Sequence, residues 1–289
     1  MPFYLYAAHV HAFSVPCNFY FPILYSDFCI LYSCLLMRID LNADVGECAG
    51  DDQALVRSVT SVNIACGFHA GDPAVMRRTV RLAMDAGVSV GAHPGFPDRQ
   101  GFGRRELDMS PRDVEDIVLY QVAALAGIAA AEGTRVRHVK AHGALYNMAA
   151  RDREIADAIV AGSAAFDRSL VVVGPPDSEL TAAATRAGLR SAAEAFADRA
   201  YRPDRSLVPR HIAGAVIDQP FAVLERALRL VRAREVTAVD GSIISIHPDT
   251  ICVHGDTPNA PAIAAQLRSG LAEAGVLVAP LDVIPLIRP

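Results

Sequence analysis

The sequence predicts an α/β fold, an irregular (β/α) barrel similar to a TIM barrel, over residues 37–289. Short apolar and β-branched runs alternate with longer helical patterns, and seven or eight such strand–helix units follow one another. Repeated units of this kind predict a parallel sheet with helices outside, and their number suits a closed barrel. The alternative is an open doubly wound sheet. No linker interrupts the pattern, so residues 37–289 are expected to form a single domain.

The strands and helices are expected in alternation along the chain. The candidate strands are 38–42, 62–65, 88–91, 136–140, 169–173, 189–196, 243–246 with 250–253, and 276–279. The helical patterns lie near 52–60, 73–86, 111–132, 152–164, 178–187, 220–233 and 259–274. A capping residue followed by proline marks three helix starts, namely Asp72-Pro73, Ser110-Pro111 and Thr257-Pro258. A glycine suited to a left-handed turn marks four helix ends, namely Gly87, Gly133, Gly188 and Gly275.

The composition is that of a folded protein and excludes several classes. Of 289 residues, 52% are hydrophobic and 20% are charged, which excludes a disordered chain. The net charge of −5 comes with both signs scattered and no basic stripe, so nucleic acid is not expected as a partner. There is no G-x-G-x-x-G after the first strand and no G-x-x-x-x-G-K-[ST] phosphate-binding loop. The six cysteines include no C-x-x-C pair, which fits a reduced, cytoplasmic compartment.

Residues 1–36 differ in composition from the rest of the chain. They hold ten of the nineteen Phe and Tyr residues and no Lys or Arg. They lack the positively charged start of a secretory signal and the run of about 20 apolar residues that a membrane helix needs. Because Met37 opens a well-formed strand, we hypothesise that it is the true start and that residues 1–36 are an upstream translation artefact. The alternative is a membrane-associating leader; no membrane is expected for residues 37–289.

Polar side chains collect where the predicted strands end. In (β/α) barrels the active site lies at the C-terminal ends of the strands. The candidates there are Asn42, Asp44, Glu47, Asn63, His69, His93, Lys140, His142, Asp198, His254 and Asp256. Arg104 follows in the glycine-rich loop 96–105, which carries three arginines and could be a lid, an anion clamp or an ordinary solvated loop. Four histidines, a lysine and several carboxylates at one end of successive strands indicate a functional site.

Two of these residues suggest specific chemistry. Lys140 is the only lysine among 27 Lys and Arg residues, and a buried lysine can be tuned toward neutrality or can hold an oxyanion as a point charge. Asp44 should point inward if Asn42 does, since side chains alternate along a strand. There it could orient an imidazole, act as a general base, or bind a divalent metal with His69 and His93.

Six motifs of the chain closely resemble, in order, those of the LamB/YcsF family. They are IDLNADVGE (39–47), NIACGFHAGD (63–72), GAHPGFPDRQGFGRR (91–105), RHVKAHGALYN (137–147), AFADRAYRPDRSLVPR (195–210) and ICVHGD (251–256). The resemblance covers nothing in residues 1–36. One departure is Ala141, where the family usually has proline, and this should loosen the turn slightly. The resemblance implies an irregular barrel similar to polysaccharide deacetylases.

The resemblance to this family further implies ATP-dependent opening of the 5-oxoproline lactam to L-glutamate, together with 5-oxoprolinase subunits B and C. ATP would be a co-substrate handled mainly by these partners. The expected catalytic residues are Asp44, His69, His93, Lys140, His142, Asp198, His254 and Asp256, and the expected substrate-binding residues are Asn42, Glu47, Asn63 and Arg104. Two alternatives are a stand-alone metal-dependent deacetylase or amidohydrolase, and a non-catalytic subunit that presents substrate.

Overall fold

The computed structural model describes residues 37–284 and 286. The predicted leader, residues 1–36, lies outside this part, and so does the hypothesis that Met37 is the true start. Of the cysteines in the described part, Cys48, Cys66 and Cys252 are free. The helices and strands given below all belong to residues 37–284, within the region predicted to form the barrel.

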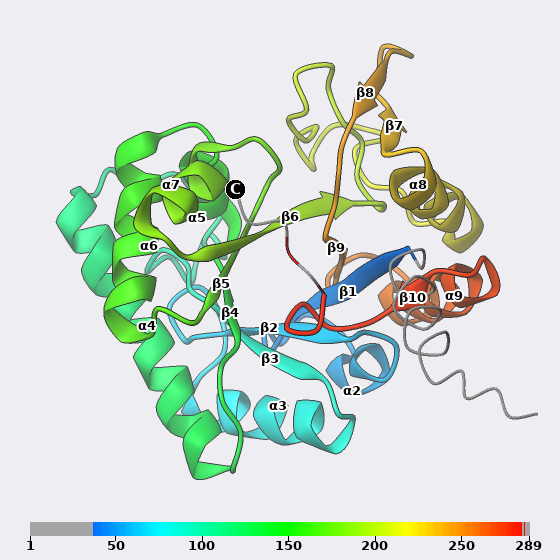
Figure 1. Cartoon of the computed structure of the whole chain (residues 1–289). Coiled ribbons are helices and arrows are strands. Elements are labelled where there is room, and N and C mark those ends of the chain that lie inside the picture. The colour runs from blue at the N-terminus through cyan, green and yellow to red at the C-terminus, as the bar shows by residue number, and fades with distance from the viewer. Residues whose placement is uncertain (1–36, 285, 287–289) are drawn as a thin grey trace, which may run out of the picture. The chain divides into compact units, whose positions relative to one another are not determined.

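Parallel strands close into a barrel (Figure 1). They are β1 (Arg38–Val45), β2 (Ser61–Ala65), β3 (Ser89–His93), β4 (His138–Lys140), β5 (Val171–Gly174), β6 (Arg190–Phe196) and β9 (Thr250–His254). Neighbours pair in this order, and β9 pairs with both β6 and β1, which closes the ring. A short strand, β10 (Leu277–Val278), pairs with the first two residues of β1. The closed ring confirms the predicted irregular barrel and excludes the open sheet.

Helices lie outside the barrel (Figure 1). They are α2 (Asp52–Val56), α3 (Pro73–Asp85), α4 (Pro111–Ala131), α5 (Gly143–Ala149), α6 (Arg153–Phe166), α7 (Glu179–Ala187), α8 (Pro220–Arg232) and α9 (Ala260–Glu273). Two predicted starts are confirmed, since the side chains of Asp72 and Ser110 accept hydrogen bonds from backbone N–H groups in the first turns of α3 and α4. The four glycines predicted at helix ends all have positive φ values, from 66° to 88°.

Some sequence-based expectations are wrong. The helix expected near 52–60 ends at Val56, and α5 was not predicted. The predicted start at Thr257-Pro258 is wrong because α9 begins at Ala260, while the Thr257 hydroxyl donates a hydrogen bond to Asp198. The expected strand 243–246 does not enter the barrel. It forms β8 (Ile243–Ser245), which pairs antiparallel with the unpredicted β7 (Glu235–Thr237). Only the central residue of β8 is buried, so it lacks the two buried faces of a barrel strand.

Within the described residues, α4 is the one helix long and apolar enough to cross a membrane by length and composition. The same helix has the features of a core helix. Val118, Val122 and Leu125 are completely buried. The buried Gln121 side chain accepts a hydrogen bond from the backbone N–H of Gly95 and donates one to its carbonyl, which ties α4 to the chain just after β3.

Polar groups fill the inside of the barrel at the start of β1. The Asp40 carboxylate accepts hydrogen bonds from the hydroxyls of Thr60 (2.8 Å), Ser61 (2.6 Å) and Thr250 (2.5 Å). Burial raises the pKa of Asp40 to about 6. The Thr250 hydroxyl in turn accepts from Asn42 Nδ2 at 2.7 Å, so this end of the barrel connects directly to the predicted site.

Candidate active site

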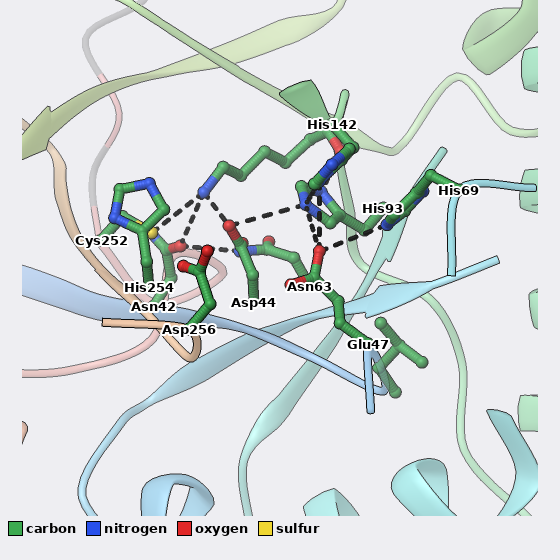
Figure 2. A network of polar contacts seen from close by, with 12 residues as sticks. Asn42, Asp44, Glu47, Asn63, His69, His93, His142, Cys252, His254 and Asp256 are labelled. Atoms are coloured by element: carbon green, nitrogen blue, oxygen red, sulfur yellow. Dashed lines mark hydrogen bonds and ion pairs between the residues drawn. The ribbon is translucent and has the colours of Figure 1, made fainter. Parts of the chain in front are cut away.

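The inner face of β1 carries Asn42 and Asp44, as the alternation of side chains predicts. Asn63 on β2 joins them, and its Nδ2 lies 2.7 Å from Asn42 Oδ1 and 2.8 Å from Asp44 Oδ1. Figure 2 places Asp44 and Asn63 between two groups of side chains, with the histidines on one side and Cys252 and His254 on the other. The strand ends therefore bring most of the predicted residues into one region.

Lys140, the last residue of β4, is 3% exposed and places its ammonium between two carboxylates. Its Nζ lies 3.0 Å from Asp44 Oδ1, 2.9 Å from Glu194 Oε1 and 3.0 Å from Cys252 Sγ. Burial alone would lower the pKa of Lys140, but the facing Asp44 and Glu194 raise it well above its usual value. Of the two roles considered for this lysine, the geometry therefore favours the fixed point charge over the neutral base.

The same contacts control the charge of Asp44. Burial opposes ionisation of this carboxylate, but the neighbouring His93 and Lys140 hold its pKa well below its usual value. Its second oxygen, Oδ2, lies 3.6 Å from His93 Nε2. Asp44 is thus an ionised group between a permanent cation and an imidazole.

Glu47 and three histidines form a second buried group, at the ends of β1 to β4 (Figure 2). Glu47 Oε1 lies 3.1 Å from His142 Nδ1, 3.3 Å from His69 Nε2 and 3.7 Å from His93 Nε2. His93 Nε2 and His142 Nδ1 are 2.9 Å apart, and the rings of His69 and His142 stack with centroids 3.8 Å apart. Four groups that can each supply one ligand atom thus face a common point.

The electrostatics of this group follow from its burial. Burial lowers the pKa of His69, and it lowers that of His93 to about 3, so the His93 imidazole is neutral. Burial opposes ionisation of Glu47, but hydrogen bonds with His142 and His69 hold its pKa well below its usual value. The group therefore combines a carboxylate with at least one neutral imidazole.

Two glycines make this arrangement possible. Gly46 has a φ of 72°, a left-handed conformation that glycine adopts readily, and it turns the chain directly before Glu47. Gly95 leaves room for an imidazole, because a Cβ at this position would lie 2.7 Å from His69 Nδ1. The small residues beside the strand-end histidines thus accommodate the rings themselves.

Asp198 and His254 form a pair across the ends of β6 and β9. His254 Nδ1 lies 3.0 Å from Asp198 Oδ2, and the imidazole stacks on Phe196 with centroids 5.1 Å apart. Burial opposes ionisation of Asp198, but His254 holds its pKa below the usual value. This pair is separate from the Glu47 group and flanks Cys252 beside Lys140.

Asp256 and Arg104 lie nearer to solvent. Arg104 Nη2 is 2.5 Å from Asp256 Oδ2, and Arg210 Nη1 is 3.3 Å from the other carboxylate oxygen. The side chains of Arg104 and Asp256 are 41% and 21% exposed, so this pair is more accessible than the buried groups. A predicted catalytic residue and a predicted substrate-binding residue thus bind each other.

Loop 96–105 contacts the histidines and is held in place by hydrogen bonds and an ion pair. Arg99 donates to two backbone carbonyls of the loop after β2, and Arg105 forms an ion pair with Asp98. The Phe102 ring packs edge-on against the stacked histidines. Of the three arginines in this loop, only Arg104 pairs with a residue of the predicted site, so an anion clamp built from all three is not formed.

Three residues of the site were not predicted. Glu194 and Cys252 lie within strands and His138 begins one, whereas the prediction concentrated on the C-terminal ends of the strands. A signal existed for Glu194, because it is a charged residue in a run of small residues that forms a barrel strand. His138 Nε2 lies 2.9 Å from Asn63 Oδ1, and burial lowers the pKa of this imidazole to about 3.

The predicted metal ligands are arranged differently from the expectation. His69 and His93 group with Glu47 and His142 rather than with Asp44 as the carboxylate. Asp44 groups instead with Cys252 and His254. In each set, the candidate ligand atoms lie within 4.8 Å of one another. Glu47, expected to bind substrate, is therefore the carboxylate at the centre of the histidines.

Known proteins resemble this chain over nearly the whole barrel. The model of the LamB/YcsF family matches residues 39–285. The A-subunit of the 5-oxoprolinase of Methylococcus capsulatus is 53% identical over 248 residues, which make up 84% of this chain and 95% of that protein. The protein of the same name from Pyrococcus abyssi is 48% identical over 250 residues, 85% of this chain and 98% of that protein. The crystal structure of a lactam utilization protein from Thermus thermophilus has a TM-score of 0.80 and 47% identity, and covers 84% of this chain and 99% of that one.

Proposed function

The chain belongs to the LamB/YcsF family, and on this premise we propose that it is the lactam-opening component of a 5-oxoprolinase. It would cleave 5-oxo-L-proline to L-glutamate with hydrolysis of ATP, together with partner subunits B and C. The names of its relatives support the substrate class. The observation that carries the proposal is the buried ionised Asp44, held by the Lys140 ammonium and adjacent to neutral His93.

An unstrained lactam is a poor electrophile, so its carbonyl needs activation before water can attack it. We assign this step to ATP, which would phosphorylate the lactam oxygen on the partner subunits. The absence of a phosphate-binding loop motif from the printed sequence supports this division of labour. The present chain would then bind the activated lactam and supply the water.

Asp44 and His93 are suited to hold that water. The Nδ1–H of His93 donates to the Lys140 carbonyl at 2.7 Å, so its Nε2 is an acceptor, like Asp44 Oδ2 at 3.6 Å from it. A water that donates one hydrogen to each is positioned to attack the carbonyl carbon, and its proton passes to His93 Nε2. Asp44 stabilises the imidazolium that forms. The C–N bond then breaks as the new hydroxyl loses its remaining proton to solvent and becomes the carbonyl of an acyl phosphate, and the leaving nitrogen takes the proton held by His93. A second water then cleaves the acyl phosphate to glutamate and phosphate.

Lys140 would stabilise the negative charge that develops on the carbonyl oxygen or its phosphate. Its three N–H donors already face Asp44, Glu194 and the thiol of Cys252. The thiol is the weakest of these acceptors, so we propose that the substrate oxygen replaces it. Arg104 is half exposed and could exchange Asp256 for the substrate carboxylate.

Glutamate formation from 5-oxoproline tests the proposal. The purified chain is assayed alone and with subunits B and C, each with and without ATP, and the Methylococcus capsulatus relative serves as a positive control for the partners. We expect glutamate only in the three-component mixture with ATP. No glutamate with partners that are active beside the relative would refute the proposal, and glutamate from the chain alone without ATP would favour a stand-alone amidohydrolase.

The use of ATP and the free cysteines of the described part favour the cytoplasm as the location of this protein.

A further inference from the structure

The four residues at the ends of β1 to β4 present an arrangement that protein groups alone do not satisfy. Glu47, His69, His93 and His142 are 8%, 1%, 1% and 5% exposed, so water reaches them poorly. Four contacts between their facing atoms measure 2.9 to 3.7 Å, and all of these atoms lie within 4.8 Å of one another. What matters is whether these facing atoms carry hydrogens or lone pairs.

For His93 and His142, the hydrogen bond of the other ring nitrogen, which points away from the group, shows which nitrogen carries the hydrogen. His93 Nδ1 lies 2.7 Å from the Lys140 carbonyl and His142 Nε2 lies 2.8 Å from the Phe102 carbonyl. A carbonyl oxygen only accepts, so each of these nitrogens carries the hydrogen. In the neutral rings, His93 Nε2 and His142 Nδ1 therefore turn lone pairs toward each other at 2.9 Å. The Glu47 carboxylate, which also only accepts, faces both.

The third imidazole, that of His69, also has an unsatisfied ring nitrogen. His69 Nε2 is directed to Glu47 Oε1 at 3.3 Å, while its Nδ1 is buried without a hydrogen-bond partner among the described residues. Gly95 and Gly103 line this ring, and a Cβ on either would lie within 2.8 Å of a His69 atom. The backbone thus leaves just enough room for the imidazole.

We propose that Glu47, His69, His93 and His142 bind one divalent transition-metal ion of the Zn²⁺ class. His93 and His142 show the usual arrangement of metal-binding histidines, with a lone pair directed to the site and the other ring nitrogen hydrogen-bonded behind it. Three imidazole nitrogens and one carboxylate oxygen suit Zn²⁺, Co²⁺ or Ni²⁺ better than Mg²⁺ or Ca²⁺, which prefer oxygen ligands. Such an ion lowers the pKa of a water bound to it. The geometry of these residues carries the inference. The ion would take the His93 Nε2 lone pair, so with the ion bound the proton of the attacking water would pass to Asp44 Oδ2 instead of His93.

Metal content of the isolated full-length chain tests the inference. The chain is stripped with a chelator, exposed to Zn²⁺ or Co²⁺, freed of unbound metal and analysed for metal per chain. We expect one ion per chain, a visible Co²⁺ absorption spectrum, and a Tm that rises with added Zn²⁺. Less than a tenth of an ion per chain would overturn the inference and leave a shared proton as the cation in this group.

Variants identify the ligands. Glu47→Gln and His93→Gln should each lower Zn²⁺ content at least tenfold and abolish the Zn²⁺-dependent rise in Tm, with far-UV circular dichroism confirming that they fold. His254→Gln, which removes a member of the neighbouring Asp44 group, and His247→Gln, which alters an exposed histidine, should retain the ion. Metal lost from His254→Gln and retained by Glu47→Gln would overturn the assignment. Because no partner or lactam is present, failure of the glutamate assay leaves this result unaffected.

Discussion

Replacing Lys140 with methionine tests the ionic centre of the barrel most directly. Methionine keeps an unbranched apolar side chain and removes the ammonium that lies 3.0 Å from Asp44 and 2.9 Å from Glu194. At an effective dielectric constant of ~20, each contact of this length supplies about 5.5 kcal/mol of Coulomb attraction. Desolvation offsets several kcal/mol per ion, so the net value of the centre is smaller. The larger effect of the substitution is that both carboxylates remain buried without a counterion.

Removing one partner of a buried ion pair costs about 3–5 kcal/mol. We therefore expect Lys140→Met to lower the free energy of unfolding by about 4 kcal/mol, which corresponds to roughly 8–16 °C in Tm. Urea unfolding followed by far-UV circular dichroism measures this value. The same protein, tested in the three-component glutamate assay, should be inactive.

The chain offers a matched control. Arg186 also contacts two carboxylates, Asp157 at 2.7 Å and Glu179 at 3.5 Å, but its side chain is 36% exposed. Arg186→Met should therefore cost less than about 1 kcal/mol. Adding Glu194→Gln to Lys140→Met should recover stability, because one of the unpaired charges is then absent.

Two outcomes would refute this reasoning. If Lys140→Met were as stable as Arg186→Met, or if Glu194→Gln did not improve it, the ammonium would not be the counterion of buried carboxylates. If Lys140→Met retained full glutamate formation, the charge of Lys140 would have no part in the reaction.

Two further predictions concern the barrel interior. The folded-state pKa of Asp40 is raised from 3.8 to about 6, so its stabilising contribution is complete below the unfolded pKa and is lost as pH rises through about 6. Between pH 5 and pH 8, wild type should lose about 1.5 kcal/mol of unfolding free energy relative to Asp40→Asn in urea titrations; an equal gap at both pH values would contradict the raised pKa. Gly91→Ala should lower stability by about 1–3 kcal/mol or more, since its Cβ would lie 2.1 Å from His138 Nε2. Gly127→Ala in α4 meets nothing within 4 Å and should raise stability by about 0.8 kcal/mol; equal Tm values for both variants would refute the predicted clash.

Local signals predicted most of the fold. Alternating patterns located each barrel strand, and Asp72 and Ser110 cap helices where expected because N-capping depends on residues adjacent in sequence. The ribbon of β7 and β8 was not predicted because these short strands pair with each other, with one buried residue each. Pairing between segments is a tertiary property that the pattern of one segment does not reveal.

The grouping of residues at the candidate site was predicted to a similar degree and for a similar reason. The rule that barrel sites lie at strand ends identified Asp44, the histidines and Lys140. It did not identify Glu194, whose inward position depends on how β6 and β9 pair as the barrel closes. Nor could it show that Glu47 replaces Asp44 among the histidines, because the turn at Gly46 decides where this side chain points.

The hydrogen-bonded series inside β1 has a consequence for protein engineering. The Thr250 hydroxyl donates to Asp40 and accepts from Asn42. Asn63 then donates to both Asn42 and Asp44, so hydrogen bonds connect Asp40 to Asp44 along the interior of the barrel. The orientation of the Asp44 carboxylate is thereby specified in part from the opposite end of the strand. Grafting only the residues at the strand ends onto another barrel would leave them without this support, so a successful transplant has to include the interior of β1 and its neighbours.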